Sequence, residues 1–197
     1  MKKESMDRAK ESLEIEAKAI TDISFYLDKN AFARAVEVMS KAERIATSGC
    51  GNSGIACMKL AHSLCCIEKP AKFIPPGEAP HGGLGFVQKG DVIVLASRGG
   101  KTAELMPILR VSKQKEAIVI GITENPESPL ALESDILLRM CIERESDKFN
   151  IMATSSFVAL VAIFDALQVA IMEETGYTLD KFAVIHPGGA VGEKLNN

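Results

Sequence analysis

Five short apolar segments separated by helical patterns constrain the fold of this chain more than any other feature. They are RIATSG (44–49), AKFIP (71–75), DVIVLAS (91–97), EAIVIGIT (116–123) and DILLRMCI (135–142). The third and fourth are apolar at both alternating positions, as in strands that are buried on both faces of a sheet. Such strands belong to parallel sheets covered by helices. The pattern therefore predicts a doubly wound, flavodoxin-like α/β domain with a five-stranded parallel sheet.

Helical patterns fill the intervals between these strands. They cover residues 53–66, 102–114, 128–133 and 154–175. Thr154 and the serines after it suit a helix start, and Gly176 suits a helix end. Two further helices, over 5–27 and 30–41, precede the first strand and have no strand partner. We expect residues 1–43 to pack on the domain or on a partner subunit, and residues 44–197 to form one domain.

Composition excludes several classes of function. A net charge of −3 over 197 residues argues against a nucleic-acid partner, which would need a basic surface. No apolar run reaches the ~18 residues that a membrane span needs, and the charged N-terminus is not a signal peptide, so neither a membrane partner nor secretion is expected. The five cysteines are Cys50, Cys57, Cys65, Cys66 and Cys141. An odd number without C-x-x-C spacing suggests reduced thiols in a cytoplasmic protein.

The loop after the first strand, SGCGNSG (48–54), has features of an anion site. Glycines let the backbone approach a ligand, and the amides at the start of the next helix favour negative charge. The loop resembles a dinucleotide-binding loop only weakly, because no acidic residue ends the second strand. A small phosphate ligand is favoured over a nucleotide.

The loop after the third strand, SRGGKTAEL (97–105), has the groups of a phosphate cradle. Ser97 and Thr102 offer hydroxyls, and Gly99 and Gly100 offer accessible backbone N–H groups. Thr102 is also suited to cap the next helix. The loop is not a P-loop, because the G-x-x-x-x-G-K-[ST] spacing is absent.

Two loop segments place a histidine beside glycines in a chain with three histidines. PPGEAPHGGLG (75–85) contains His81, and HPGGAVG (186–192) begins with His186. A loop histidine among Gly and Pro has little apolar packing to provide, which favours a functional role. His62 lies within a helical pattern and is expected to be structural. The histidines and acids lack metal-ligand spacing such as H-E-x-x-H, so no metal or other cofactor is expected.

In this order and spacing, the motifs resemble the sugar isomerase (SIS) domain family, in particular its arabinose-5-phosphate isomerases. Those enzymes typically read GMGKSG, HPGEAAHGDLG, SNSGESSE, APTSS followed by GDAL, and SHPGGALGR. This chain reads GCGNSG, PPGEAPHGGLG, SRGGKTAE, MATSS followed by FDAL, and IHPGGAVGE. The resemblance runs from Ile45 to Gly192. Family members often continue into a pair of regulatory CBS modules, which these 197 residues do not include.

The resemblance implies a homo-tetramer or homo-dimer that interconverts an aldose phosphate and its ketose. Such chemistry requires ring opening, removal of a proton next to a carbonyl and its return to the neighbouring carbon. A carboxylate suits the proton transfer and a histidine suits ring opening. By position, the family's catalytic residues correspond to Glu104, Glu145 and His186, and a substrate-site histidine corresponds to His81. Glu145 is the leading candidate for proton transfer, with Glu104 as a second acid or an orienting group.

The phosphosugar-binding positions follow from the same resemblance. Ser53, Ser97 and Thr102 match phosphate-binding hydroxyls, and Thr154 begins the helix that faces the ligand. The remaining positions of the two loops are Gly51, Asn52, Arg98, Gly99, Gly100 and Lys101.

Departures from the family pattern fall within these loops. The lysine of GKSG is Asn52, a hydroxyl of SNSGE is lost at Gly99, the acid of that motif is Lys101, and the aspartate of AHGD is Gly83. A cation that the family places at the site is therefore missing.

Two explanations remain open. Either Lys101 or Arg98 supplies the missing charge in an isomerase for a different phosphosugar, or the domain binds a phosphosugar without converting it, as SIS domains in regulators do. The two acids and two loop histidines favour the isomerase. An oligomerising scaffold without a ligand is disfavoured by the three glycine-rich loops. The sequence decides neither the sugar nor whether His186 acts in its own subunit or a neighbour's.

Overall fold

A computed structural model of the chain describes residues 2–188 and Gly192. Five strands form one sheet in the order β2-β1-β3-β4-β5, and every neighbouring pair is parallel. The strands are β1 (Ile45–Gly49), β2 (Ala71–Phe73), β3 (Val92–Ala96), β4 (Ile118–Thr123) and β5 (Ile136–Arg139). The predicted doubly wound parallel sheet is confirmed.

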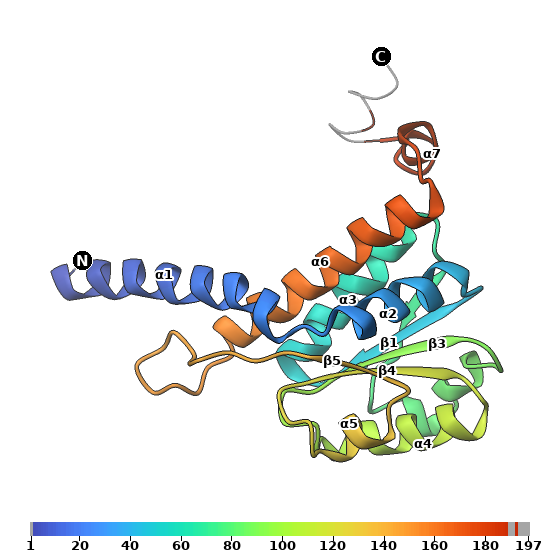
Figure 1. Ribbon diagram of the computed structural model, residues 1–197, viewed down its shortest axis with the longest axis horizontal. Helices are drawn as coiled ribbons and strands as arrows, with labels where there is room; N and C mark the ends of the chain where they lie inside the picture. The colour runs from blue at the N-terminus through green and yellow to red at the C-terminus, as the bar shows by residue number, and fades with distance from the viewer. Residues whose placement is uncertain (1, 189–191, 193–197) are drawn as a thin grey trace.

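Helices cover both faces of the sheet (Figure 1). One face carries α2 (Lys29–Lys41), α3 (Gly51–Cys65) and α6 (Ser155–Thr175), and the other carries α4 (Met106–Gln114) and α5 (Pro129–Glu133). The long α1 (Lys3–Tyr26) packs on α6. The short helices η1 (Ala79–His81), η2 (Gly83–Phe86), η3 (Ala103–Leu105) and α7 (Leu179–Ile185) complete the described chain.

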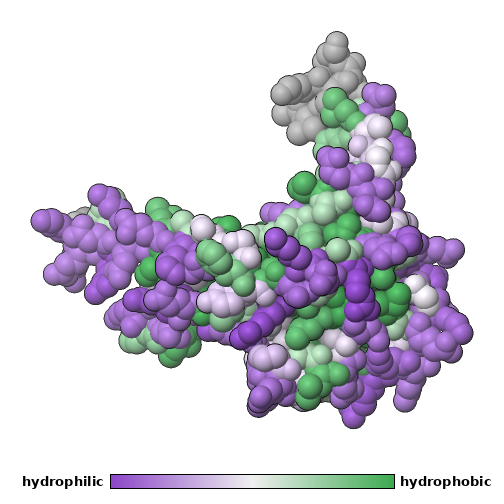
Figure 2. Space-filling view, in the orientation of Figure 1, coloured by the Kyte–Doolittle hydropathy of each residue, from purple (hydrophilic) through white to green (hydrophobic). Residues whose placement is uncertain are grey.

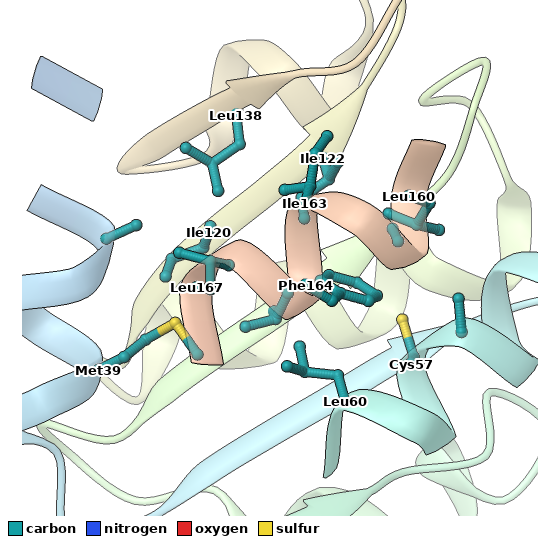
Figure 3. Packing of buried hydrophobic residues seen from close by; sticks show 14 of the residues in the cluster. Met39, Cys57, Leu60, Ile120, Ile122, Leu138, Leu160, Ile163, Phe164 and Leu167 are labelled. Atoms are coloured by element: carbon teal, nitrogen blue, oxygen red, sulfur yellow. The ribbon is translucent and has the colours of Figure 1, made fainter. Parts of the chain in front are cut away.

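Helix α6 forms the centre of the main hydrophobic core. Its Leu160, Ile163, Phe164 and Leu167 lie between the strands and the helices α2 and α3 (Figure 3). Phe164 has no exposed surface. Among the described helices, α6 alone is long and apolar enough to cross a membrane, a property that buried core helices share. Because α6 packs against the sheet and against α1, α2 and α3, we attribute its apolarity to core packing.

The sheet order determines where a ligand can bind. The chain passes from β1 to β2 on one side and then returns to β3 on the other side of β1, so the switch point lies between β1 and β3. Ligands of open α/β sheets bind at the carboxyl ends of the strands beside this point. Gly49 at the end of β1 pairs with Ala96 at the end of β3, so SGCGNSG and SRGGKTAEL begin side by side.

The two ends of α6 differ in how well the sequence predicted them. Gly176 adopts the left-handed conformation with φ 59° and ends the helix, as expected. Thr154 occupies the N-cap position, but its side chain makes no capping hydrogen bond to α6. The expectation that this hydroxyl caps the helix is therefore wrong, and Glu145 meets the need for a cap instead, as described below.

Replacing Phe164 with alanine should lower the free energy of unfolding by about 3–5 kcal/mol, because the core cannot close the cavity that the ring leaves. Val169→Ala is the matched control, since Val169 lies on the same helix and is 60% exposed; its effect should stay within about 0.5 kcal/mol. Urea denaturation followed by circular dichroism measures both. Equal effects would show that α6 is not the centre of the core.

Candidate functional site

The loops after β1 and β3 meet at the carboxyl edge of the sheet. Burial raises the pKa of the Cys50 thiol, and the negative charge of Glu104 raises this pKa further. Cys50 directly follows β1 and Glu104 lies in η3, which follows β3, so both residues lie at the carboxyl edge of the sheet. Glu104 itself is exposed, so this acid is accessible at the carboxyl edge of the sheet.

The β3 loop is held in a fixed conformation. The hydroxyl oxygens of Ser97 and Thr102 lie 2.7 Å apart and share a hydrogen bond, and the Gly100 N–H donates to Ser97 Oγ over 3.1 Å. Thr102 stands at the N-cap position of η3 but makes no capping hydrogen bond, so the predicted cap is wrong there too. The Thr102 hydroxyl instead pairs with Ser97, which places two hydroxyls together in the loop.

The glycines of the loops have two different roles. Gly100 has φ +65°, and a Cβ there would clash with Ser128 Oγ. A Cβ on Gly54 would lie 2.5 Å from the carbonyl oxygen of Gly49. These glycines are required by tight packing of the protein itself. Around Gly51 and Gly99 the corresponding space is open, so at these two positions a ligand could approach the backbone.

The two cations proposed to replace the missing lysine differ in their surroundings. Arg98 is half-buried, and its guanidinium donates to Glu124 over 2.8 Å and to Glu145 over 2.7 Å. Lys101 is exposed and has no ion-pair partner among residues 2–188. Of the two, Lys101 has its charge available for an anionic ligand. Asn52 is exposed and Ser53 is half-buried in the neighbouring loop.

Glu145 has no exposed surface and serves as the cap of α6. Its Oε2 accepts hydrogen bonds from the N–H groups of Thr154 and Ser156 at 2.9 and 3.1 Å and from Thr154 Oγ1 at 3.0 Å. Its Oε1 accepts from Arg98 and from the Ser156 hydroxyl. A carboxylate offers about four lone-pair positions, so these five donors leave little acceptor capacity.

This environment controls the charge of Glu145. Burial alone would raise its pKa, but the hydrogen bonds from Ser156 and Thr154 outweigh burial, and the pKa is lowered. Hydrogen bonds to the charged form of an acid stabilise that form. In this conformation Glu145 is an ionised group with reduced basicity, whereas a proton acceptor works best with a pKa near the working pH.

The two loop histidines lie in different parts of the molecule. His81 is exposed at the end of η1, in the loop that follows β2. His186 ends α7, where its ring stacks on Phe182 at 3.8 Å and its Nδ1 lies 3.0 Å from the Phe182 carbonyl oxygen. In the rest of the HPGGAVG motif, residues 189–191 lie outside the described residues.

Within one chain, His186 is not brought to Glu145. Helix α7 projects from the body beyond the C-terminal end of α6 (Figures 1 and 2), whereas Glu145 binds the N-terminal end of α6. The 21 residues of α6 separate these two ends by roughly 30 Å.

The sequence does not mark Ser156 and Glu124 as site residues, nor the ion pair between Arg98 and Glu145. A capping box would have marked the cap, but it needs an acid three residues after the N-cap, and Glu145 lies nine residues before Thr154. The ion pair joins residues 47 positions apart. No local sequence signal indicates it.

Replacing Glu145 with glutamine should lower the free energy of unfolding by about 1–3 kcal/mol at pH 7, because an amide cannot accept all five hydrogen bonds. The folded-state pKa of Glu145 is lowered, so the stability that its charge provides is present above the ordinary carboxyl pKa. This stability is lost as the pH falls through the lowered value. The difference in unfolding free energy between the wild type and Glu145→Gln should therefore persist at pH 7 and shrink only below about pH 4.

Glu143→Gln is the matched control. Urea denaturation at pH 7 and below about pH 4 measures the free energy of unfolding of both variants. The Glu143 side chain is 70% exposed and pairs with Lys18 at 3.1 Å, so its replacement should cost less than about 0.5 kcal/mol. Equal stability of the two variants at pH 7 would contradict the role of Glu145 as the cap.

Solved structures with the same fold include several linked to phosphosugars. A proposed sugar-phosphate isomerase from Listeria monocytogenes is 41% identical, with a TM-score of 0.93 over 95% of this chain and 100% of that chain. Protein c3406 of Escherichia coli CFT073, in complex with arabinose 5-phosphate, is 27% identical, with a TM-score of 0.86 over 95% of this chain and 100% of that chain. The Vibrio vulnificus NanR protein complexed with ManNAc-6P shares the fold at 24% identity and a TM-score of 0.80, over 91% of this chain and 69% of that chain.

Curated relatives extend over most of the chain. The arabinose 5-phosphate isomerase KdsD of Pseudomonas aeruginosa is 36% identical over 83% of this chain, and that of Escherichia coli K12 is 35% identical over 94%. The chain spans 51% and 57% of the lengths of these two relatives. The model of the SIS domain matches residues 38–170. The chain belongs to the SIS domain family.

Proposed function

We propose that this protein is a phosphosugar aldose–ketose isomerase, with arabinose 5-phosphate and ribulose 5-phosphate as the leading pair. Support comes from the relatives named arabinose 5-phosphate isomerase and from the similar protein c3406, whose structure contains arabinose 5-phosphate. The fold and both glycine-rich loops are compatible with a ligand that carries one phosphate.

The position of Glu104 is the observation that favours an enzyme over a protein that only binds phosphosugars. This exposed carboxylate lies in the same loop as the hydroxyl pair of Ser97 and Thr102, two residues after Thr102. A negative charge beside a phosphate weakens binding, so a protein that only binds phosphosugars gains nothing from it. An isomerase needs a carboxylate there to move a proton between neighbouring carbons.

In the proposed reaction, the loop groups hold the phosphate and the acids act on the sugar. The phosphate takes hydrogen bonds from the hydroxyls of Ser53, Ser97 and Thr102, and Lys101 provides the positive charge. His81 or His186 assists ring opening. A carboxylate removes the proton from C2, next to the carbonyl, and returns it to C1. The proton of the C2 hydroxyl passes to the oxygen at C1, so the aldose becomes the ketose. Glu145 and Glu104 are the two candidates, and no cofactor is needed for these steps.

We further propose a cytoplasmic homo-tetramer or homo-dimer in which His186 serves the site of a neighbouring subunit. Support comes from the position of α7, which lies beyond the end of α6 opposite to Glu145. Leu179 and Val184 of α7 are 65% and 76% exposed, and exposed apolar side chains of this size favour contact with another protein.

A phosphosugar sensor without catalysis is the second candidate. Two observations favour it: Asn52 stands where the family has a lysine, and Glu145 is an ionised cap with a lowered pKa. Such a protein would bind phosphosugars through the same hydroxyls and Lys101. It would exchange no proton with them.

Incubation with ribulose 5-phosphate in deuterium oxide should place deuterium at C1 and produce a new aldose signal, because the proton passes through an acid that exchanges with solvent. One-dimensional proton NMR measures both, with a reaction lacking protein as the control. A rise in melting temperature with phosphosugars but no exchange would support the sensor. Exchange at the rate of the control and no rise in melting temperature would contradict both candidates for this ligand class.

Lys101→Ala should weaken phosphosugar binding about tenfold, because a charge-assisted hydrogen bond to the phosphate is worth about 1.5 kcal/mol. Calorimetric titration measures the affinity. The matched control is Lys89→Ala, since Lys89 is an exposed lysine that precedes β3 and so lies at the opposite edge of the sheet. An affinity unchanged by Lys101→Ala would mean that this side chain faces only solvent.

A further inference from the structure

Arg98 connects the ends of three neighbouring strands. Its carbonyl oxygen accepts hydrogen bonds from Thr123 Oγ1 at 2.8 Å and from the Glu124 N–H at 3.0 Å, so its backbone is fixed to the end of β4. Its Nε donates to Glu124 at 2.8 Å, and its Nη1 reaches Glu145 in the loop after β5 at 2.7 Å. A side chain held at both its backbone and its guanidinium cannot easily turn toward a ligand in the β3 loop.

Glu145 is enclosed by groups that keep it charged and in place. The charged groups around it are Arg98 from the β3 loop, Glu124 beyond that guanidinium, Arg144 beside it in the chain, and Glu16 of α1. Arg144 donates to the Glu145 carbonyl oxygen, and Glu16 accepts from the hydroxyl of Ser146, the next residue. Arg98 is therefore the only cation that the described residues place on the Glu145 carboxylate.

Glu104 has the opposite surroundings. It is exposed, it lies in η3 at the end of the loop that follows β3, and it has no ion-pair partner among the described residues. Glu104 follows Thr102 by two residues and is open to a ligand in this loop, whereas Glu145 has no exposed surface.

We propose that Arg98 is a positioning residue that clamps Glu145 as the ionised cap of α6, and that Glu104 is the group that transfers the substrate proton. This inference rests on the proposed isomerase function. It reverses the order of the two acids that the motifs favoured. It also explains Arg98 itself: the family pattern has an uncharged asparagine at this position, and here the guanidinium joins the end of β4 to the N-terminus of α6. The cation that meets the phosphate is then Lys101 and not Arg98.

The clamp is tested by melting temperature as a function of pH, which needs no turnover. Arg98→Met removes the guanidinium and keeps much of the apolar stem, Arg98→Lys keeps the charge, and Arg139→Met is the control at an exposed arginine of β5. Loss of an opposite charge raises a carboxyl pKa by about one unit or more. Arg98→Met should therefore lose stability at acid pH about one pH unit earlier than the wild type, with partial rescue by Arg98→Lys. An acid transition unchanged from that of Arg139→Met would overturn the clamp.

The assignment of the acids is tested by proton exchange with ribulose 5-phosphate. Glu104→Gln should slow exchange at least about 100-fold while leaving the melting temperature within about 1 °C, because an exposed side chain contributes little to stability. Arg98→Met should lower kcat about tenfold and change KM less than about twofold, as a residue that positions the site does. Near-normal exchange in Glu104→Gln would overturn the role of Glu104. A tenfold increase in KM with unchanged kcat in Arg98→Met would place Arg98 on the phosphate and overturn the clamp.

The two proposals fail in different ways. A wild-type protein that exchanges no proton with any phosphosugar would overturn the isomerase and the role of Glu104 together. The melting series would then decide the clamp by itself. An active wild type with an unshifted acid transition in Arg98→Met would leave the isomerase standing and remove the clamp.

Discussion

Burial of α6 is the constraint on which the rest of the structure depends. The helix contacts the helices α1, α2 and α3 and supplies Phe164 and Leu167 to the core against the sheet. A helix N-terminus leaves backbone N–H groups without partners in the helix, and inside a protein these groups need acceptors. Glu145 provides the acceptor at this end of α6. The packing that forms the core therefore also requires a buried acceptor at the carboxyl edge of the sheet, and here that acceptor is the Glu145 carboxylate.

Much of the fold could be predicted because its signals are local or repeat along the chain. Short apolar segments marked all five strands, and helical periodicity marked α1 to α6 within a few residues of their bounds. The helices η1 and η2 were not predicted, since three or four residues are too short to show a period. Helix α7 is seven residues long, and its apolar residues are largely exposed, so no buried face marked it in the sequence.

The site was less predictable because its decisive contacts join distant segments. The motifs identified the loops, but they left Arg98 and Lys101 as equal candidates for a phosphate-binding cation. The ion pair of Arg98 with Glu145 exists because β4 lies between β3 and β5 and brings the end of β3 near the loop after β5. The glycines of the loops were ambiguous for a similar reason. Gly54 and Gly100 are needed for tight contacts within the protein. The sequence alone does not distinguish such glycines from glycines that let a ligand approach the backbone.

The residues that match catalytic and substrate-site positions of the SIS domain family lie in two separate parts of this chain. Glu104, Glu145 and His81 lie in loops at the carboxyl edge of the sheet, whereas His186 lies beyond the far end of α6. A rigid helix in the core cannot shorten to bring these groups together, and α6 ends at Gly176 before α7 begins. In the proposed homo-oligomer, His186 would therefore meet the acids of another chain. Catalysis would then depend on assembly, and the buried helix α6 would set the spacing between the two halves of each site.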